Sequence, residues 1–233
     1  MASEPDPQAS WDPVTSRETA ATILADIASA RPSVLVAAAL ARRSKLPFKA
    51  ACYRDSLLWR IEELGRTALG SYDRDDHVTA ILLGRGAMET VAALHSLHRL
   101  VTTYQGGDVD GLDEKLMSML LGSRVRDDRP NAINILTAID KVTKDVPAFR
   151  HLYDQLSEFA HPNDAGTASS FAVLTTRPLA AQFTARGEQY ERRAWLMIEC
   201  LATSLMLVLP LYGELLAAAD GFAALCDADV RPA

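Results

Sequence analysis

Cysteine is scarce in this sequence, and the few that occur lie far apart. Cys52, Cys200 and Cys226 form no Cys-x-x-Cys pair among the 233 residues. The first residues, MASEPDPQASWDP, lack the basic stretch and the apolar stretch of a secretory signal. We therefore expect buried thiols in a reducing compartment, and the sequence predicts a cytoplasmic protein without disulfides.

Positive charge is also in short supply. The chain has 24 Lys and Arg against 30 Asp and Glu, which gives a formal net charge of −6. Proteins that grip nucleic acid by counterion release usually present a broad basic face, and no such face is indicated here. A negative net charge does not exclude a small basic patch.

Long apolar runs are missing as well. The most apolar segment lies between Glu199 and Glu214 and holds 14 uncharged residues, whereas about 18 are needed to suggest a membrane helix. Pro210 interrupts this segment, and proline breaks or kinks a helix. We expect a buried helix that is kinked or divided at Pro210, in a soluble protein with no membrane partner.

The chain is rich in periodic segments of alanine and leucine. Its 48% of apolar and 23% of charged residues suffice for one sizeable core, and the periodic pattern favours helices over sheet. The predicted fold is all-α, a helical bundle of about seven or eight helices with a short β-hairpin after His161. The predicted layout is a mobile N-terminal tail (1–14), a single helical domain (15–226) and a C-terminal tail (227–233).

Caps and breakers divide the chain into segments. The expected helices span 15–31, 33–46, 48–69, 76–104, 112–121, 131–145, 147–161 and 188–225. In the third of these, charged residues are expected on the outer side: Arg54, Asp55, Arg60, Glu62 and Glu63. The segment SSFAVLTTRPLAAQFTAR is rich in Thr, Val and Phe and is broken at Arg177-Pro178, which predicts two short strands.

The segment RHLYDQLSEFAHPNDAG, residues 150–166, puts polar side chains on one stripe of a helix. Tyr153, Ser157 and His161 are spaced four residues apart, and Asp154 is within reach of the same stripe. Pro162 and a turn that includes Asn163 follow at once. We therefore expect His161 at the C-terminus of the helix, where the helix dipole favours the imidazolium.

A second polar pair lies on the long helix expected over 76–104. Arg85 and Glu89 are four residues apart, so they share a face and can pair. Gly84 and Gly86 flank the arginine, and glycine costs a helix about 1 kcal/mol against alanine, which suggests that another backbone passes close by or that the guanidinium turns inward. Because a charge among Ala, Leu and Gly needs a partner, we expect Arg85 or Glu89 within hydrogen-bonding distance of the Tyr153 stripe.

The two motifs RGAMET and LSEFAHPN resemble those of bacterial helical proteins of the HEPN-like and abortive-infection-like group. The resemblance is carried by Arg85 with Glu89 and by Leu156, Ser157, His161, Pro162 and Asn163. It implies an all-α bundle, often dimeric, and in the active members a metal-independent ribonuclease with an Arg and a His separated by four to six residues. In this sequence the nearest Arg before His161 is Arg150, with ten residues between them.

Two interpretations of these polar residues stay open. In one they form a buried network that fixes the packing of the helices. In the other they line a pocket, where Arg85 binds an anion, His161 acts as acid or base, and Glu89 or Asp154 orients it. The catalytic candidates are His161, Arg85 and Glu89. The ligand-binding candidates are Arg85, Glu89, Tyr153, Asp154, Ser157, His161 and Asn163.

His95 and His98 have a spacing of three residues that metal sites use, but no carboxylate completes a recognisable set. No metal site and no cofactor are expected.

Two classes of function follow. The first is an HEPN-like binding or interaction module, as part of a toxin–antitoxin or phage-defence system. The alternative is a metal-independent enzyme that acts on RNA or a nucleotide through an Arg/His site. The expected partners are a second copy in a homodimer, another protein, or a nucleotide or RNA. The two classes differ in whether Arg85 and His161 converge on an accessible cavity.

Overall fold

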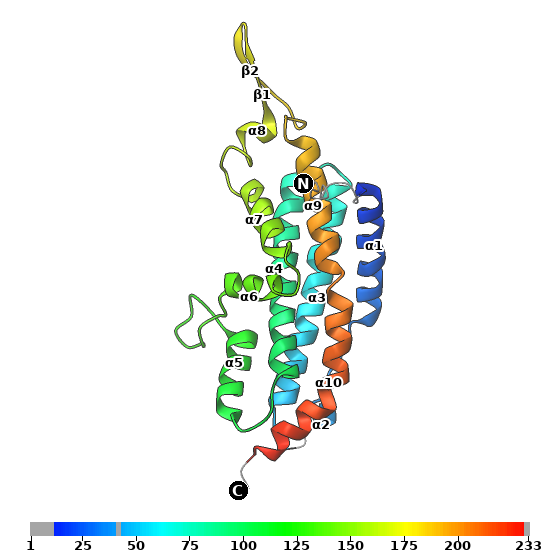
Figure 1. Ribbon diagram of the computed structural model, residues 1–233, viewed down its shortest axis with the longest axis vertical. Helices are drawn as coiled ribbons and strands as arrows, with labels where there is room; N and C mark the ends of the chain where they lie inside the picture. Colours follow the sequence, from blue (N-terminus) through cyan, green and yellow to red (C-terminus); the bar gives the residue numbers. More distant parts are fainter. Residues whose placement is uncertain (1–11, 41–42, 231–233) are drawn as a thin grey trace, which may run out of the picture. The chain divides into compact units, whose positions relative to one another are not determined.

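The computed structural model describes residues 12–40 and 43–230, and these residues are predominantly helical (Figure 1). The longer helices are α1 (Pro13–Ala30), α3 (Leu46–Tyr72), α4 (His77–Thr102), α5 (Val109–Leu121), α6 (Ile135–Thr143), α7 (Phe149–Ala160), α9 (Tyr190–Leu205) and α10 (Val208–Ala228). Two helices of four residues, α2 (Ala37–Leu40) and α8 (Ala168–Phe171), and two strands, β1 (Ala172–Thr176) and β2 (Leu179–Phe183), complete this part of the chain. The prediction of an all-α bundle with a short hairpin after His161 is confirmed.

Contacts within the chain group the described residues into two compact units. Unit 1 comprises residues 12–26, 63–88 and 151–206, and unit 2 comprises 27–62, 89–150 and 207–230. Because α1, α3 and α4 contribute residues to both units, this grouping neither confirms nor contradicts the single domain predicted over 15–226. Most of the predicted N-terminal tail, residues 1–11, lies outside the described residues, as do residues 231–233 of the predicted C-terminal tail.

The core of unit 1 includes one face of α7. Leu152, Tyr153, Leu156 and Phe159 are all buried, and their spacing places them on one side of a helix. Burying such a stripe supplies most of the stability of a helix of this length.

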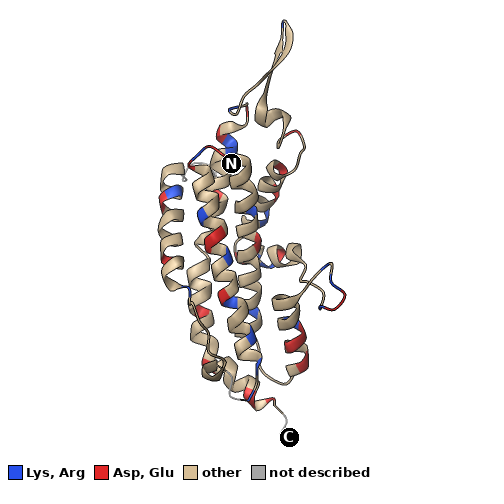
Figure 2. Ribbon diagram, turned by 180° about the vertical axis from the view of Figure 1, so that it is seen from behind, with Lys and Arg blue, Asp and Glu red and all other residues tan. Residues whose placement is uncertain are grey.

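The hairpin also belongs to unit 1. β1 and β2 pair antiparallel, with Thr176 opposite Leu179, so that Arg177 and Pro178 form a two-residue turn. Figure 2 shows the hairpin almost without charged residues. Its position confirms the two short strands predicted from the Thr, Val and Phe content of the segment.

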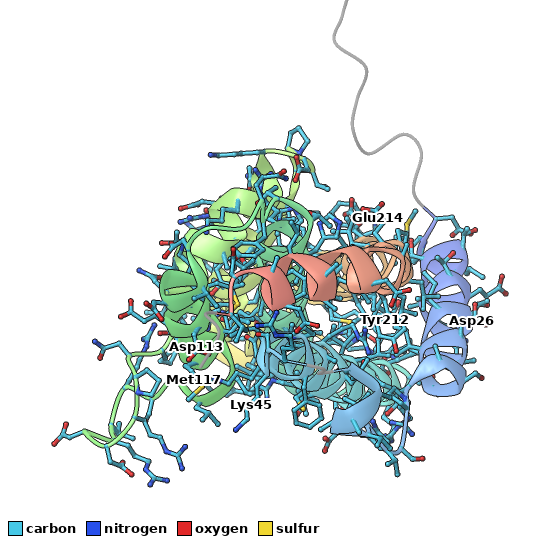
Figure 3. All side chains as sticks on the ribbon, turned by 90° about the horizontal axis from the view of Figure 1, so that it is seen from below. Asp26, Lys45, Asp113, Met117, Tyr212 and Glu214 are labelled. Atoms are coloured by element: carbon cyan, nitrogen blue, oxygen red, sulfur yellow. The ribbon has the colours of Figure 1, made fainter. Side chains whose placement is uncertain are left out.

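Helices α6 and α10 illustrate how unit 2 forms its core. Ala138, Ile139 and Val142 of α6 are buried, at the spacing of one helical face. On α10, Tyr212 is buried and Glu214 is exposed, and the two lie on opposite sides of the helix (Figure 3).

The region expected to form a helix over 33–46 forms only the four residues of α2 among the described residues. Val34 and Val36 are exposed, and α2 has no buried residue. A short helix without a packed face gains too little to offset the cost of nucleation. In addition, α3 begins earlier than expected, at Leu46, because Pro47 is tolerated in a first turn.

The prediction that the charged residues of α3 lie on its outer side is wrong for three of them. Arg54, Asp55 and Glu62 are buried. Arg54 is paired with Asp55, and Glu62 with Arg31, so each charge has a counter-ion inside the protein. The helix also runs through Gly70, the expected end, and stops at Tyr72.

The last helical stretch is divided before Pro210, as predicted. α9 ends at Leu205, and α10 begins at Val208, with Pro210 in its first turn. Proline cannot donate a hydrogen bond to the carbonyl four residues earlier, which here belongs to Met206. At the other end α10 continues to Ala228, so Asp227 and Ala228 are helical instead of forming a tail.

The stretch Tyr190–Ala228 is long and apolar enough to cross a membrane by length and composition alone. Of its most apolar window, 56% is buried inside the protein, and the buried core helix of a soluble protein meets the same test of length and composition. The absence of a membrane partner stays a prediction.

Candidate functional site

Arg85 of α4 and Tyr153 of α7 meet inside unit 1. The guanidinium donates hydrogen bonds to the Tyr153 hydroxyl from Nε (3.2 Å) and from Nη2 (3.0 Å). Its Cζ atom lies 5.3 Å from the centre of the tyrosine ring, within range of a cation–π interaction. The predicted contact between the Arg85 helix and the Tyr153 stripe is therefore confirmed.

Ser157 and Asn163, two other residues of the predicted site, make their hydrogen bonds away from this contact. The Ser157 hydroxyl donates to the Tyr153 carbonyl one turn earlier, at 2.8 Å, and is thus used within its own helix. Asp154 is exposed. Asn163 donates to Glu158 (2.7 Å) and accepts from the Gly166 amide (3.0 Å), which holds the turn after α7.

His161 follows directly after α7, at the helix C-terminus where it was expected. Its side chain is exposed, and it makes no side-chain hydrogen bond within the described residues. Two helical turns, about 12 Å of rise, separate it from Tyr153 along α7. The imidazole of His161 therefore lies away from the contact between Arg85 and Tyr153.

The glycines beside Arg85 have a different environment from the one expected. A Cβ atom added at Gly84 would lie 3.9 Å from Leu156 Cδ2, and one at Gly86 would lie 3.5 Å from Leu64 Cδ1. Both are ordinary contacts with side chains, so no other backbone within the described residues passes close to Gly84 or Gly86. Glu89 follows Arg85 by one turn of α4 and is half-buried.

His95 and His98 bind separate carboxylates of unit 2. His95 Nε2 lies 2.7 Å from Asp145 Oδ2, and His98 Nε2 lies 2.6 Å from Glu214 Oε2. Among the described residues no group of three or more His, Cys, Asp and Glu could hold a metal ion.

The cysteines are free thiols. Burial raises the pKa of Cys226 to about 12 and that of Cys200 well above its usual range. Thiols with such pKa values stay protonated and are poor nucleophiles. Cys52 is only half-buried, against the expectation that all three would be buried.

A buried arginine that the sequence analysis did not single out lies in unit 1. The side chain of Arg193 is 2% exposed, and its Nη2 donates to the Ala185 carbonyl at 3.2 Å. Its Nε and Nη1 have no hydrogen-bond partner in the described part of the chain. Burial lowers the pKa of Arg193. The same guanidinium contributes to the lowered pKa of His77, for which burial is the larger cause.

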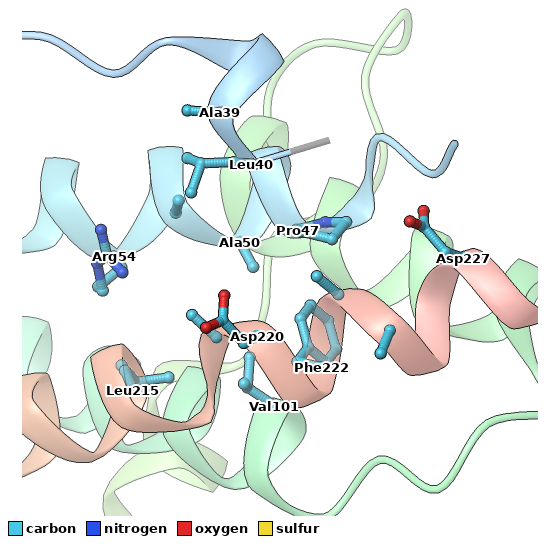
Figure 4. A pocket seen from close by; sticks show the side chains of 14 residues that line it. Ala39, Leu40, Pro47, Ala50, Arg54, Val101, Leu215, Asp220, Phe222 and Asp227 are labelled. Carbon is cyan, nitrogen blue, oxygen red and sulfur yellow. The ribbon is translucent and has the colours of Figure 1, made fainter. Parts of the chain in front are cut away.

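Unit 2 contains a cavity of about 270 Å³ lined by residues of α2, α3, α4 and α10 (Figure 4). Alanine side chains of α3 and α10 form much of its lining, and Arg54 and Asp220 add charge. Arg54 is held by Asp55 through two hydrogen bonds of 2.7 and 2.8 Å. Burial opposes the charge of Arg54, but the carboxylate outweighs this effect, and the pKa of Arg54 is raised. The buried charge is thus satisfied by the protein itself, without a ligand.

A second hollow of unit 2 is larger and has a different character. This groove has a volume of about 510 Å³ and lies between α4, α5 and α6. Its lining residues are Ser96, Arg99, Leu100, Thr103, Glu114, Lys115, Ser118, Met119, Ile133 and Lys141. Small-molecule sites commonly have volumes of about 300 to 1,000 Å³.

The groove has an excess of positive charge in an acidic protein. Arg99, Lys115 and Lys141 face a single carboxylate, that of Glu114. Lys115 and Lys141 make no ion pair within the residues that the structure describes. Arg99 approaches Asp145 only at 3.7 Å, and that carboxylate lies closer to His95. The positive charges at the groove are therefore weakly compensated.

Ser96 adds a buried polar group to the same groove. The residue is 7% exposed, and its hydroxyl has no hydrogen-bond partner among residues 12–40 and 43–230. Buried hydroxyls in native proteins nearly always have a partner, and one that lacks it points to a water, an ion or a ligand. Ser96, Arg99 and Thr103 repeat every three or four residues on one face of α4, the only signal of the groove in the sequence.

Comparisons with known proteins identify no relative: no protein-family model, no curated protein and no solved structure matches this chain.

Proposed function

We propose that this protein is a binding module whose ligand is a phosphorylated small molecule of nucleotide size, held in the groove between α4, α5 and α6. The observation that carries the proposal is the set of weakly compensated cations, Arg99, Lys115 and Lys141, beside the buried Ser96 hydroxyl that has no partner among the described residues. No metal or other cofactor is part of the proposal.

The groove offers suitable partners for both parts of such a ligand, its phosphate and its apolar body. Arginine and lysine bind phosphate oxygens through charge-assisted hydrogen bonds, and a serine hydroxyl can donate one more. Leu100, Met119 and Ile133 provide an apolar wall for a base or another flat apolar group. A ligand with a phosphate and an apolar body can use both parts at once.

The enzymatic alternative is supported less well. It requires a general acid or base beside an anion-binding arginine, whereas Arg85 binds Tyr153 and His161 is exposed two turns away. A binding role requires no such pair. We retain from the HEPN-like resemblance the proposal that the module serves a toxin–antitoxin or phage-defence system.

Calorimetric titration with AMP, adenosine and inorganic phosphate tests the proposal. We expect AMP to bind more tightly than either fragment, because only AMP places its phosphate and its base together. Raising the salt concentration should weaken the binding of AMP and leave that of adenosine nearly unchanged, since exposed charge interactions are screened.

Single substitutions locate the site. Arg99→Gln and Lys141→Gln should each weaken AMP binding about three- to tenfold, the range for the loss of one partly exposed ionic contact. Ser96→Ala should weaken it by a similar factor. Lys144→Gln is the matched control, because Lys144 is an exposed cation just after α6 that does not line the groove. Absence of AMP binding, or equal losses in the Lys144 variant and the groove variants, would refute the proposal.

A further inference from the structure

The hairpin β1–β2 has one apolar face and one more polar face, which follows from its register. Leu174 is opposite Ala181, Ala172 is opposite Phe183, and Thr176 is opposite Leu179. Paired residues of an antiparallel ladder project to the same side, and every second residue along a strand does so too. One face therefore carries, in sequence order, Ala172, Leu174, Thr176, Leu179, Ala181 and Phe183. The other carries Val173, Thr175, Ala180 and Gln182.

The apolar face is open to solvent. The exposed fractions of Leu174, Leu179 and Phe183 are 71%, 86% and 82%. Every residue of β2 is exposed. Isolated two-stranded hairpins are marginally stable in water, and they normally bury their apolar side against another layer. A cluster of three large exposed apolar side chains on one face points to an interaction surface.

Contacts at its base hold the hairpin to unit 1. The Thr184 amide donates to the Phe171 carbonyl (2.9 Å), which extends the pairing beyond the strands. The buried Arg193 donates to the Ala185 carbonyl and lies 5.0 Å from the centre of the Phe171 ring. Arg186 reaches Asp75 at 3.0 Å. The residues at the base of both strands are thus held by unit 1, and the hairpin presents its apolar face from a fixed base.

We propose that the apolar face of the hairpin packs against the same face of a second copy of this chain. The segment 165–185 contains one charged residue, Arg177 at the turn, so no charge selects a partner of opposite sign. Nor does charge keep two identical faces apart, since none of the six residues of the apolar face is charged. In a dimer with a twofold axis, the same surface of both copies forms the interface. An apolar surface that fits against itself is therefore sufficient for such a dimer.

The charge of the protein argues against a lipid surface as the occupant. Peripheral membrane elements combine apolar side chains with several Lys and Arg that attract anionic lipids. Here a single Arg accompanies the apolar face, on a chain of formal net charge −6.

Sedimentation velocity of the full chain over a range of micromolar concentrations tests this self-association. We expect a monomer–dimer equilibrium in which the dimer fraction rises with concentration. Phe183→Glu places a charge in the apolar face and should leave the protein monomeric throughout that range. Gln182→Glu, its matched control on the same strand but on the opposite face, should dimerise like the original protein.

Far-UV circular dichroism establishes whether each variant is folded. If Phe183→Glu is unfolded, Leu179→Glu at the other end of β2 replaces it, because Leu179 lies on the same apolar face. A chain that is monomeric at every concentration overturns the proposal. Equal dimerisation of Phe183→Glu and Gln182→Glu overturns it as well. Cosedimentation of a monomeric chain with anionic phosphatidylserine vesicles, lost in Phe183→Glu, would assign the face to lipid instead.

Discussion

At the scale of single residues, the hydroxyl of Tyr153 and the imidazole of His161 have opposite surroundings, although both lie on the stripe predicted for α7. Tyr153 is buried and accepts two hydrogen bonds from Arg85. Tyr153→Phe should lower the free energy of unfolding by about 1 to 2 kcal/mol, because the two hydrogen bonds that the part-buried guanidinium donates to the hydroxyl are lost. Urea denaturation at pH 7 measures this loss.

His161→Ala is the comparison for that experiment. The imidazole is exposed and makes no side-chain hydrogen bond within the described residues, so the expected change is within about 0.5 kcal/mol. A larger loss for His161→Ala than for Tyr153→Phe would show that the stability of α7 depends on the end of the helix and not on the Arg85 contact.

His77 should make stability depend on pH. It is 3% exposed, and its ring lies 4.7 Å from that of Tyr190. Burial, and then the charge of Arg193, lower its pKa below the usual 6.5. As the pH falls below about 6.5, the unfolded chain takes up a proton that folded His77 does not bind. The stability that neutral His77 contributes is therefore complete above this pH and is lost as the pH falls towards the folded-state pKa.

His77→Phe keeps an aromatic ring at this position and removes the titration. We expect its free energy of unfolding to fall less between pH 7.5 and 5.5 than that of the original protein, as measured by urea denaturation at a series of pH values. His151→Gln changes an exposed histidine and should leave the slope as it is. An unchanged slope in His77→Phe would contradict the prediction.

At the scale of elements, Gly84 and Gly86 of α4 destabilise their helix, and neither is required there by a close contact with another described residue. A methyl group at Gly86 would lie 3.5 Å from Leu64 Cδ1, an ordinary contact. Gly86→Ala should therefore raise the free energy of unfolding by about 0.5 to 1 kcal/mol, since alanine is the better helix former. Thermal and urea denaturation both report the change.

Gly166, in the turn after α7, provides the contrast. A Cβ atom there would lie 1.9 Å from the His161 carbonyl oxygen and 2.9 Å from that of Phe159. Backbone atoms cannot move aside as a flexible side chain can, so Gly166→Ala should destabilise the protein by about 1 kcal/mol or more. If both substitutions destabilise equally, α4 needs its glycines for a reason other than local space.

Most elements could be predicted from the sequence because their signals are local. The stripe of Leu152, Leu156 and Phe159 predicts α7, and Pro210 predicts the division of the last helical stretch. The prediction over 33–46 was wrong because alanine content does not show whether a helix will have a surface to pack against.

At the scale of the whole molecule, a formal charge of −6 and a groove with three cations occur in the same chain. Net charge describes the average, whereas a binding site depends on which charges the fold collects and leaves without counter-ions. The proposed module therefore needs no basic excess in its composition. The groove forms only when α4, α5 and α6 are packed against one another as they are in this fold.

The sequence by itself determined the all-α class, the hairpin after His161 and the approach of Arg85 to Tyr153, because apolar periodicity and the need to pair a buried charge act over a few turns of helix. Only the tertiary structure decided that His161 stays in solvent and that Arg54 and Arg193 are buried. It alone also brings Ser96, Lys115 and Lys141 to one groove. A lysine on a helix looks like part of a solvated face in the sequence, and its role depends on what the neighbouring helices place opposite it.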